Sequence, residues 1–290
     1  MIENKKKNIL ITGGSVGLGF EFAKHFVLKG SNIIICARNK KNLLKAKSSL
    51  ENLKKKNQKV FTYKIDVSNE SDVRRLYKNI SKKFKHIDVL ISNAGVYGPK
   101  GSLEYSSWKE WQSAFRINCF GSIYLIKIFL RLLKKSRRGK IVQLSGGGAT
   151  SPLANLSCYA TSKAAIVRFT ETLSLEIAKY NIDINCIAPG ALNTRLLNEI
   201  IKAGPKKVGK DFYKKSLKQK ANGGAGYEKA LELCDFLCSE NSNGITGRLL
   251  SAQWDNYHII KKLKKKISDS DIFTLRRIVG KDRSLKKLDK

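Results

Sequence analysis

Short apolar segments alternate with longer amphipathic segments along most of this 290-residue chain. The apolar segments have the length of β-strands, and the segments between them have the spacing of apolar residues that is typical of helices. Strands that alternate with helices predict a parallel sheet covered on both faces. We therefore expect an α/β fold with a doubly wound parallel sheet, and place its strands at residues 8–12, 31–37, 59–65, 88–92, 139–145, 182–187 and 248–251.

A glycine-rich turn, Thr12-Gly-Gly-Ser-Val-Gly-Leu-Gly19, follows the first of these strands. It precedes an apolar-periodic helix at residues 20–28, so its backbone N–H groups would lie at a helix N-terminus, where a pyrophosphate binds. Gly13 allows the tight turn, Gly17 the approach of the phosphates, and Gly19 the packing of helix against strand. The turn predicts a dinucleotide-binding Rossmann fold, in which Thr12, Ser15 and Leu18 also contact the cofactor.

Tyr159 and Lys163 form a second motif, in the run Ser157-Cys-Tyr-Ala-Thr-Ser-Lys163. Residues four apart lie on the same face of a helix, so the Lys163 ammonium would lie near the Tyr159 phenol. A phenol has an ordinary pKa of about 10 and exchanges protons at neutral pH only if a nearby positive charge lowers that pKa. The spacing therefore predicts that Lys163 lowers the pKa of Tyr159 and makes it a catalytic acid or base.

The chain resembles the classical short-chain dehydrogenase/reductase family over residues 7–251. The resemblance rests on the two motifs above and on four others in the family's order: Asp66-Val67, Asn93-Ala94-Gly95, Asn118 and Pro189-Gly190. The resemblance implies hydride transfer between NAD(P) and a carbonyl or secondary alcohol, with Tyr159 as proton donor or acceptor. It implies that Lys163 also holds the ribose, and that Asn118 bends a long helix and connects Lys163 to water. It further implies that seven residues bind the cofactor: Asp66 and Val67 at the adenine, Asn93, Ala94 and Gly95 beside the ribose, and Pro189 with Gly190 after the sixth strand.

Arg38 bears on the choice between the two cofactors. The second strand ends in Ala37-Arg38, where an NAD-preferring enzyme places an acid that binds the ribose 2′-hydroxyl. That acid is absent, and a guanidinium can pair with a 2′-phosphate. We therefore expect NADP(H) to be favoured over NAD(H); the alternative is that Arg38 simply faces solvent.

The chain departs from the family pattern at the serine that usually stands thirteen residues before the tyrosine, because Gly146 occupies that position. Ser145 is one residue away. A slip of one residue along a strand turns a side chain to the other face, although the glycines that follow permit conformations that would return the hydroxyl. Either Ser145 orients the substrate carbonyl, or a backbone N–H of the glycine run or a substrate hydroxyl does so.

These motifs leave the substrate open. We favour a sugar or nucleotide-sugar ketone, with a 3-oxoacyl group on an acidic carrier protein as the alternative. Carrier-protein reductases resemble the chain less after Gly247, where residues 248–254 lead into an added tail. A rival of another class is a cofactor-binding regulator or scaffold without turnover. The missing serine supports that rival, and the intact Tyr159 and Lys163 oppose it.

The net charge of +34 arises from 57 basic and 23 acidic side chains. The excess is mostly lysine and is spread over the helices, so we expect no specific nucleic-acid partner. Residues 193–226 have weak periodicity and carry eight lysines between 202 and 220. We interpret this segment as a mobile lid over a small-molecule substrate, which the lysines attract if it is anionic.

Six cysteines without a Cys-x-x-Cys pair indicate reduced thiols, and no metal site is expected. The N-terminus leads into the first strand without a signal peptide, and the longest apolar run, 122–133, is shorter than the about 20 residues of a membrane span. We expect a cytoplasmic homodimer or homotetramer without a membrane span. One domain would cover residues 1–252, followed by a basic extension, 253–290, with a short helix at 271–278.

Overall fold

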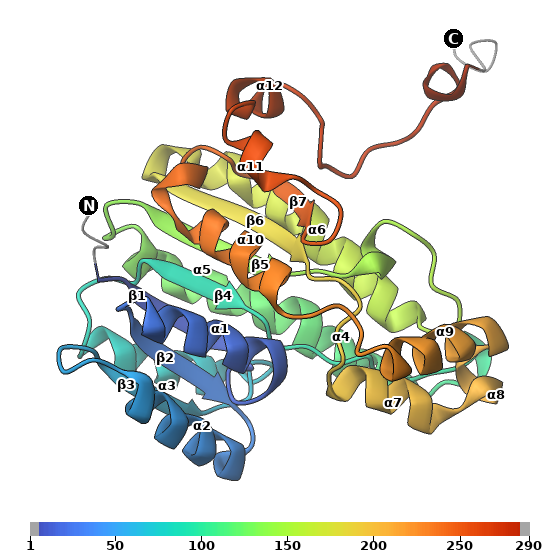
Figure 1. The fold of residues 1–290 in the computed structure, drawn as a ribbon, viewed down its shortest axis with the longest axis horizontal. Helices are drawn as coiled ribbons and strands as arrows, with labels where there is room; N and C mark the ends of the chain where they lie inside the picture. Colours follow the sequence, from blue (N-terminus) through green and yellow to red (C-terminus); the bar gives the residue numbers. More distant parts are fainter. Residues whose placement is uncertain (1–5, 285–290) are drawn as a thin grey trace.

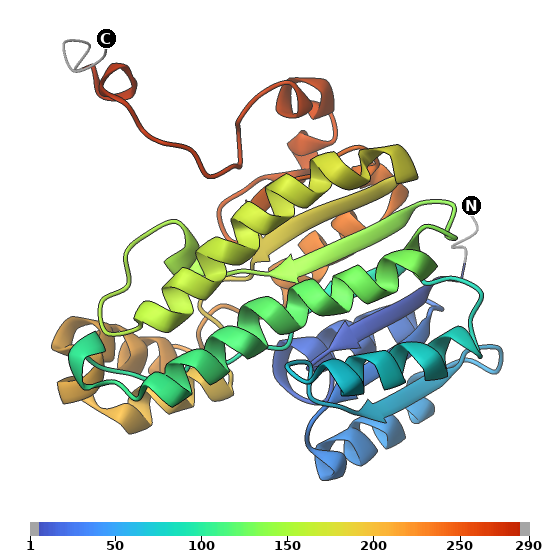
Figure 2. The same ribbon diagram turned by 180° about the vertical axis from the view of Figure 1, so that it is seen from behind.

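A computed structural model describes residues 6–284, and Figures 1 and 2 show it from opposite sides. Within these residues seven parallel strands form one sheet in the order β3-β2-β1-β4-β5-β6-β7. The strand order reverses between β1 and β4, and at such a point the carboxyl ends of the strands leave a crevice for a ligand. The strands are β1 Asn8–Thr12, β2 Asn32–Ala37, β3 Val60–Lys64, β4 Val89–Ser92, β5 Gly139–Leu144, β6 Ile182–Ala188 and β7 Arg248–Ser251.

Helices cover both faces of the sheet, and three of the longer helices lie on each face. The front face in Figure 1 carries α1 (Gly17–Leu28), α2 (Lys40–Leu53) and α10 (Glu228–Cys238). The face turned forward in Figure 2 carries α3 (Glu70–Ser81), α5 (Gly121–Leu133) and α6 (Ser157–Ile177). Successive residues of β1 enter opposite cores: Ile9 and Ile11 pack under the first set of helices and Leu10 under the second. The strands are therefore apolar on both faces.

A chain of buried hydrogen bonds crosses the sheet below the carboxyl ends of its central strands. Ser92 Oγ lies 2.8 Å from Ser122 Oγ, which also donates to Gln143 Oε1. Gln143 Nε2 in turn donates to Thr170 Oγ1 over 2.9 Å. The chain links β4, α5, β5 and α6 and fixes the strand ends that carry the site described below.

One helix runs without a break from Trp108 to Leu133. It consists of α4 (Trp108–Phe115), the π-helical turn η2 (Arg116–Phe120) and α5. By length and composition this helix could cross a membrane, whereas the apolar run 122–133 alone is too short to do so. Half of the most apolar part of the helix is buried in the protein. Core helices meet the same criteria, and this helix packs as one, against α3, α6 and the sheet.

Residues 193–226 form three helices: α7 (Arg195–Ala203), α8 (Pro205–Val208) and α9 (Lys210–Ala221). They project together from the carboxyl edge of the sheet in Figure 1. The two ends of the segment are joined, because Ala225 N donates to Ala191 O over 2.9 Å and Leu192 pairs with Ala225. The segment is thus a helical flap on a narrow base, more regular than its sequence indicates.

After β7 the chain returns to the sheet. Ile260 of α11 (Tyr257–Ile260) and Ile267 of α12 (Lys264–Ser268) are buried in the same core cluster as α1 and α10. The described residues also form short 3₁₀ turns: η1 Leu103–Tyr105, η3 Gly147–Ala149, η4 Ala178–Tyr180, η5 Glu240–Ser242 and η6 Gly280–Arg283.

The predicted helix at 271–278 is wrong, because residues 272–274 form a turn, with Phe273 at a φ of +64°, and residues 275–278 lie in no helix or strand. Phe273 O accepts a hydrogen bond from Leu249 N over 2.8 Å. The buried Arg248 guanidinium donates to Ser270 O and Ile272 O, both over 2.8 Å. These carbonyl oxygens bond to the sheet edge and its arginine, so they are not used in a helix.

Candidate active site

The glycine-rich turn has the backbone that its sequence predicts. Gly13 and Gly17 have φ of +64° and +57°, in the left-handed region that disfavours a β-carbon. A β-carbon at Gly19 would lie 2.4 Å from Asn93 Nδ2 and 2.5 Å from Gly13 O. Helix α1 begins here without a capping side chain or an acid in its first turn, so its N-terminus can receive an anion. The turn, with the buried Ser15 and Leu18 beside it, fits the phosphates of a dinucleotide.

Thr12 joins this turn to the end of β4. Its Oγ1 accepts hydrogen bonds from the backbone N of Asn93 and of Ala94, each over 3.0 Å. Asn93 Nδ2 donates back to Thr12 O over 3.0 Å. The segments predicted to hold the phosphates and the ribose are therefore fixed to each other.

Arg38 and Asp66 lie at the carboxyl ends of β2 and β3. Arg38 Nη1 is 3.8 Å from Asp66 Oδ2, and the Arg38 side chain is 58% exposed. Asp66 Oδ1 also accepts from Ser68 Oγ over 2.7 Å. The carbonyl of Val67 lies close to α5, where a β-carbon at Gly121 would be 2.7 Å from it. An exposed pair at this distance is weak, so Arg38 can turn to another anion.

Asn118 lies in η2, the π-helical turn, a form of helix that often marks a functional site. Its Oδ1 accepts from Val96 N over 2.9 Å, and its Nδ2 donates to Val96 O over 2.8 Å and to Ser162 Oγ over 2.9 Å. A β-carbon at Gly95 would lie 3.3 Å from Asn118 Oδ1 and 3.6 Å from Lys163 Nζ. Asn118 therefore holds the loop after β4 against α6, close to Lys163.

Tyr159 and Lys163 lie one turn apart on α6, as predicted, but the expected effect on the pKa is wrong in this structure. Lys163 Nζ donates to Leu144 O over 2.6 Å and lies 5.7 Å from the centre of the Tyr159 ring. Burial lowers the pKa of Lys163 to about 8. Burial also raises the pKa of Tyr159, and the neighbouring Tyr97 adds to this rise. Loss of water around the phenol outweighs a cation whose hydrogen bond is directed at the Leu144 carbonyl.

Gly146 lies directly against the Tyr159 hydroxyl. A β-carbon at Gly146 would be 2.6 Å from Tyr159 Oη. Ser145 N bonds to Ile187 O over 2.8 Å, which continues the ladder between β5 and β6, and the Ser145 Oγ is buried without a hydrogen-bond partner. The backbone at Gly146 is extended, with φ of −178°, so adjacent side chains point to opposite faces. The glycine run gives the Ser145 hydroxyl no contact with Tyr159 here.

Pro189 and Gly190 lie directly after β6. Gly190 has φ of +97°, and a β-carbon there would be 2.6 Å from Gln253 Cγ. Gln253 Nε2 donates to Pro189 O over 3.4 Å. The turn that leads into α7–α9 is therefore fixed by the residue that follows β7.

The inner face of α7–α9 is apolar and covers Tyr159. One cluster joins the flap to the catalytic helix and to the loop after β4; it contains Leu156, Ile200 and Val208, with Tyr97, Leu153, Tyr159, Ala203, Phe212 and Tyr213 packed against them. Glu199 of α7 lies 3.5 Å from Lys100 Nζ, which ties the flap to the same loop. A substrate that reaches Tyr159 meets mainly aliphatic and aromatic side chains.

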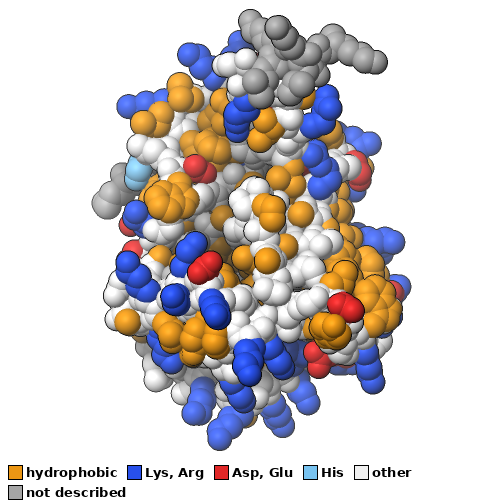
Figure 3. All heavy atoms as spheres, turned by 90° about the vertical axis from the view of Figure 1, so that its right-hand side faces the viewer, with side chains coloured by type: hydrophobic (Ala, Val, Ile, Leu, Met, Phe, Trp, Pro, Cys, Tyr) orange, Lys and Arg blue, Asp and Glu red, His pale blue; other side chains and the backbone are white. Residues whose placement is uncertain are grey.

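The eight lysines of the flap are all exposed, at positions 202, 206, 207, 210, 214, 215, 218 and 220. Figure 3 views the molecule from the side onto which α7–α9 project, and lysine and arginine side chains are spread over that face and its outline. The flap is thus amphipathic, with an apolar side toward Tyr159 and a cationic side toward solvent.

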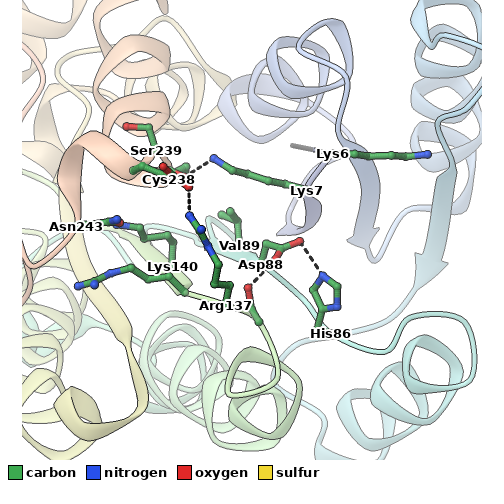
Figure 4. A pocket seen from close by; sticks show the side chains of 13 residues that line it. Lys6, Lys7, His86, Asp88, Val89, Arg137, Lys140, Cys238, Ser239 and Asn243 are labelled. Atoms are coloured by element: carbon green, nitrogen blue, oxygen red, sulfur yellow. Dashed lines mark hydrogen bonds and ion pairs between the residues drawn. The ribbon is translucent and has the colours of Figure 1, made fainter. Parts of the chain in front are cut away.

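A separate cavity of about 300 Å³ opens at the amino edge of the sheet, where β1, β4 and β5 begin (Figure 4). Two of its basic side chains are bonded within the protein: Lys7 Nζ donates to Cys238 O over 2.7 Å, and Lys140 Nζ lies 2.8 Å from Asp183 Oδ2. These bonds hold the strand starts together. The cavity is lined by none of the described residues that the sequence assigns to the site.

The sequence motifs do not include Tyr97 or the apolar residues of α7–α9. Tyr97 lies two residues after the Asn93-Ala94-Gly95 turn, and its ring centre is 4.6 Å from that of Tyr159. Its place in the loop directly after that turn is the only signal that points to it. In the described part of the chain, no group of three or more His, Cys, Asp or Glu side chains is arranged to hold a metal ion.

Comparison with known proteins is consistent with this geometry. A family model described as short chain dehydrogenase matches residues 7–204. The chain is 31% identical over 247 residues to the 3-oxoacyl-[acyl-carrier-protein] reductase of Chlamydia trachomatis, covering 84% of this chain and 95% of that protein. It is 30% identical over 241 residues to dehydrogenase/reductase SDR family member 4 of Bos taurus, covering 83% and 84%. The structure of NAD⁺-bound xylitol dehydrogenase matches with a TM-score of 0.77 at 25% identity, covering 84% of this chain and 96% of that one.

Proposed function

The chain belongs to the short-chain dehydrogenase family and is an oxidoreductase acting on CH–OH or carbonyl groups; on this basis we propose that it reduces the ketone of a 3-oxoacyl thioester with NADPH. The observation that carries the proposal is the surroundings of Tyr159. Its ring packs under the apolar face of α7–α9, and its hydroxyl lies at the end of β5, beside Gly146. A ketone held there would have an acyl chain among apolar side chains and its oxygen at a phenol.

The residues of the site have distinct roles in the proposed reaction. The turn at Gly13, Gly17 and Gly19 holds the pyrophosphate at the N-terminus of α1. The bound nicotinamide supplies the hydride. Tyr159 gives its proton to the carbonyl oxygen, as a general acid does.

Two features of α7–α9 favour an acyl chain over a sugar. A sugar ketone needs hydrogen-bond partners for several hydroxyls, because an unpaired polar group costs about 1–3 kcal/mol when it is buried. In the cluster around Leu156 the phenols of Tyr97, Tyr159 and Tyr213 are the polar groups, and the other members are apolar. The exposed lysines on the outer side suit an acidic carrier protein that delivers an acyl chain. The relative from Chlamydia trachomatis is named for that activity.

The substrate proposal is tested by the oxidation of NADPH in the presence of defined ketones. We expect turnover with the acetoacetyl thioesters of an acyl carrier protein and of N-acetylcysteamine, and little with xylulose. Tyr159→Phe removes one hydroxyl and should lower kcat by about 10²- to 10⁴-fold while NADPH still binds. Binding of NADPH without turnover of any ketone would instead favour a regulator or scaffold. Faster turnover of xylulose than of the thioesters would favour a sugar ketone as the substrate.

The preference for NADPH is supported by Arg38 and by the missing acid at Ala37. The bound cofactor of xylitol dehydrogenase is NAD⁺, so membership in the family leaves this choice open. Arg38→Asp should weaken NADPH binding by about 1.5–3 kcal/mol, the value of a hydrogen bond to a charged group, and spare NADH. Fluorescence titration of both cofactors measures this, and an equal loss for both would contradict the assignment. A cytoplasmic homo-oligomer remains part of the proposal.

A further inference from the structure

Position 146 leaves the proposed reduction without the second hydroxyl that its family supplies. Polarising a carbonyl takes a hydrogen-bond donor beside the proton donor. Gly146 has no side chain, and the Ser145 Oγ is buried without a partner, on the opposite face of the extended backbone. The side chain that takes this role must therefore come from another element of the site.

Tyr97 is a phenol in the required place. Its ring centre is 4.6 Å from that of Tyr159, and the two planes are inclined by 58°. The two hydroxyls lie close enough for a negative charge on Tyr97 to raise the pKa of Tyr159. Within residues 6–284 neither hydroxyl is among the enclosed side-chain atoms that lack a hydrogen-bond partner. A ligand atom that reaches both hydroxyls would accept a hydrogen bond from each.

The loop that carries Tyr97 is fixed from two sides. Gly98 has φ of +76°, and a β-carbon there would lie 2.6 Å from Ala114 Cβ, so the backbone approaches α4 closely. Lys100 Nζ donates to Gly98 O over 3.2 Å and lies 5.8 Å from the centre of the Tyr97 ring. The same Nζ is 3.5 Å from Glu199 Oε2 of α7. The Tyr97 ring is thus aimed at Tyr159 by the backbone and by an ion pair to the flap.

We propose that Tyr97 is a second catalytic hydroxyl, which donates a hydrogen bond to the carbonyl oxygen of the substrate while Tyr159 protonates that oxygen. The inference rests on the proposed function. When bound, a reduced nicotinamide would supply a hydride, which is a proton with two electrons, to the carbonyl carbon. As the C=O π bond breaks, the carbonyl oxygen would take the Tyr159 proton, and a proton from water would later replace it. Tyr97 keeps its proton throughout, so it stabilises the developing negative charge without entering the proton balance.

The test compares Tyr97→Phe with Ser145→Ala, using NADPH and the acetoacetyl thioester of N-acetylcysteamine. Tyr97→Phe should lower kcat by about 10²- to 10³-fold, as the loss of one donor to an oxyanion does, with unchanged NADPH binding and melting temperature. Ser145→Ala should stay near wild type. Tyr77→Phe removes a phenol that packs against Phe129 in a core cluster without Tyr159, and it is the matched control, expected to change kcat little.

The pH profile separates donation to the substrate from an indirect effect on Tyr159. Burial raises the pKa of Tyr97, so it remains a donor at neutral and mildly alkaline pH. The loss in Tyr97→Phe should therefore be the same factor at every pH in that range. A shifted profile with an unchanged maximum kcat would overturn the inference, because Tyr97 would then act only by tuning the pKa of Tyr159.

Failure of this inference can be told from failure of the proposed function. If wild type turns over, Tyr159→Phe does not, and Tyr97→Phe is as active as wild type, only the role of Tyr97 is refuted. A large loss in Ser145→Ala alone would return the role to Ser145. If wild type reduces no ketone, the proposed function fails and the role of Tyr97 fails with it.

Discussion

Position 146 determines how closely the Tyr159 hydroxyl approaches the end of β5. The backbone at Gly146 is extended, a conformation that any residue can adopt. Glycine is therefore required at this position by the lack of space and not by the backbone. The nearest atom to a β-carbon would be Tyr159 Oη, at 2.6 Å, and the ring carbon Cζ would follow at 3.5 Å. The site is therefore built around a tyrosine that fills part of the space next to position 146.

Gly146→Ala should displace Tyr159 and lower turnover with little loss of stability. A shift of about 1 Å in a catalytic group can cost about 10²-fold in rate. Gly147→Ala is the matched control, because no atom lies within 4 Å of a β-carbon at Gly147. Steady-state kinetics and thermal melting of the two variants measure the effect. Equal activity in both would mean that Tyr159 tolerates a neighbour at position 146.

At this scale, spacing predicts which residues meet and burial decides what they do. The four-residue separation correctly places Tyr159 and Lys163 on one face of α6. It does not reveal that Lys163 Nζ bonds to Leu144 O or that burial dominates the pKa of the phenol. Tyr97 belongs to no periodic segment, so only the fold brings it to Tyr159.

The flap α7–α9 has one side suited to the acyl chain of the proposed substrate and another suited to its acidic carrier protein. Its apolar side packs on Tyr159, and its lysines face solvent. Charges that face solvent attract a partner over a distance set by salt, about 10 Å at 0.1 M ionic strength. They would act on a carrier protein and not on the acyl chain itself.

The Michaelis constant for an acetoacetyl acyl-carrier-protein should therefore rise with salt, while that for the uncharged N-acetylcysteamine thioester should not. Lys214→Glu with Lys218→Glu on α9 should raise only the first constant at low salt. Lys45→Glu with Lys47→Glu on α2 makes the same change in net charge away from the flap and is the control. If neither Michaelis constant changes with salt, these lysines have no role in binding the carrier protein.

Strands were predictable because they are apolar on both faces, and all seven predicted segments overlap the observed strands to within a residue at each end, β1 and β7 without any difference. The flap was harder, since α7–α9 are short helices whose apolar residues are separated by lysines and glycines. The segment 271–278 misled because its charges suit a helix while its carbonyl groups are bonded to β7 and Arg248. The structures of α7–α9 and of residues 271–278 depend on contacts between distant parts of the chain, which local sequence patterns do not show.

The tail after β7 belongs to the structure of the whole molecule, because it completes an edge of the sheet. The two N–H groups of β7 that point away from β6 are both bonded: Leu249 N to Phe273 O over 2.8 Å, and Ser251 N to Asp255 Oδ2 over 2.7 Å. Leu275 N donates to Glu171 Oε1 over 2.6 Å and ties the tail to α6. Arg248 holds the segment between these contacts.

Arg248→Met should loosen the tail without unfolding the sheet. Its guanidinium donates to three backbone carbonyl groups, those of Ser268, Ser270 and Ile272. Hydrogen bonds to a charged group contribute about 1.5–3 kcal/mol, so we expect a local loss of that order. Hydrogen exchange at Leu249 and Leu275 should accelerate, while exchange in β1 stays slow. Arg277→Met, at an exposed position, is the control, and unchanged exchange at Leu249 would show that Arg248 does not hold the tail.

The bonded edge of β7 has a consequence for how copies of this protein can add to one another. Edge strands recruit further strands through unpaired N–H groups, and an endless fibre needs a recruiting edge on both sides of every molecule. Here β3 and β7 are the two edges of the sheet, and the N–H groups on the outer side of β7 are already bonded. Pairing through strands would therefore stop after two molecules joined at β3, because neither would offer a third molecule a place to attach.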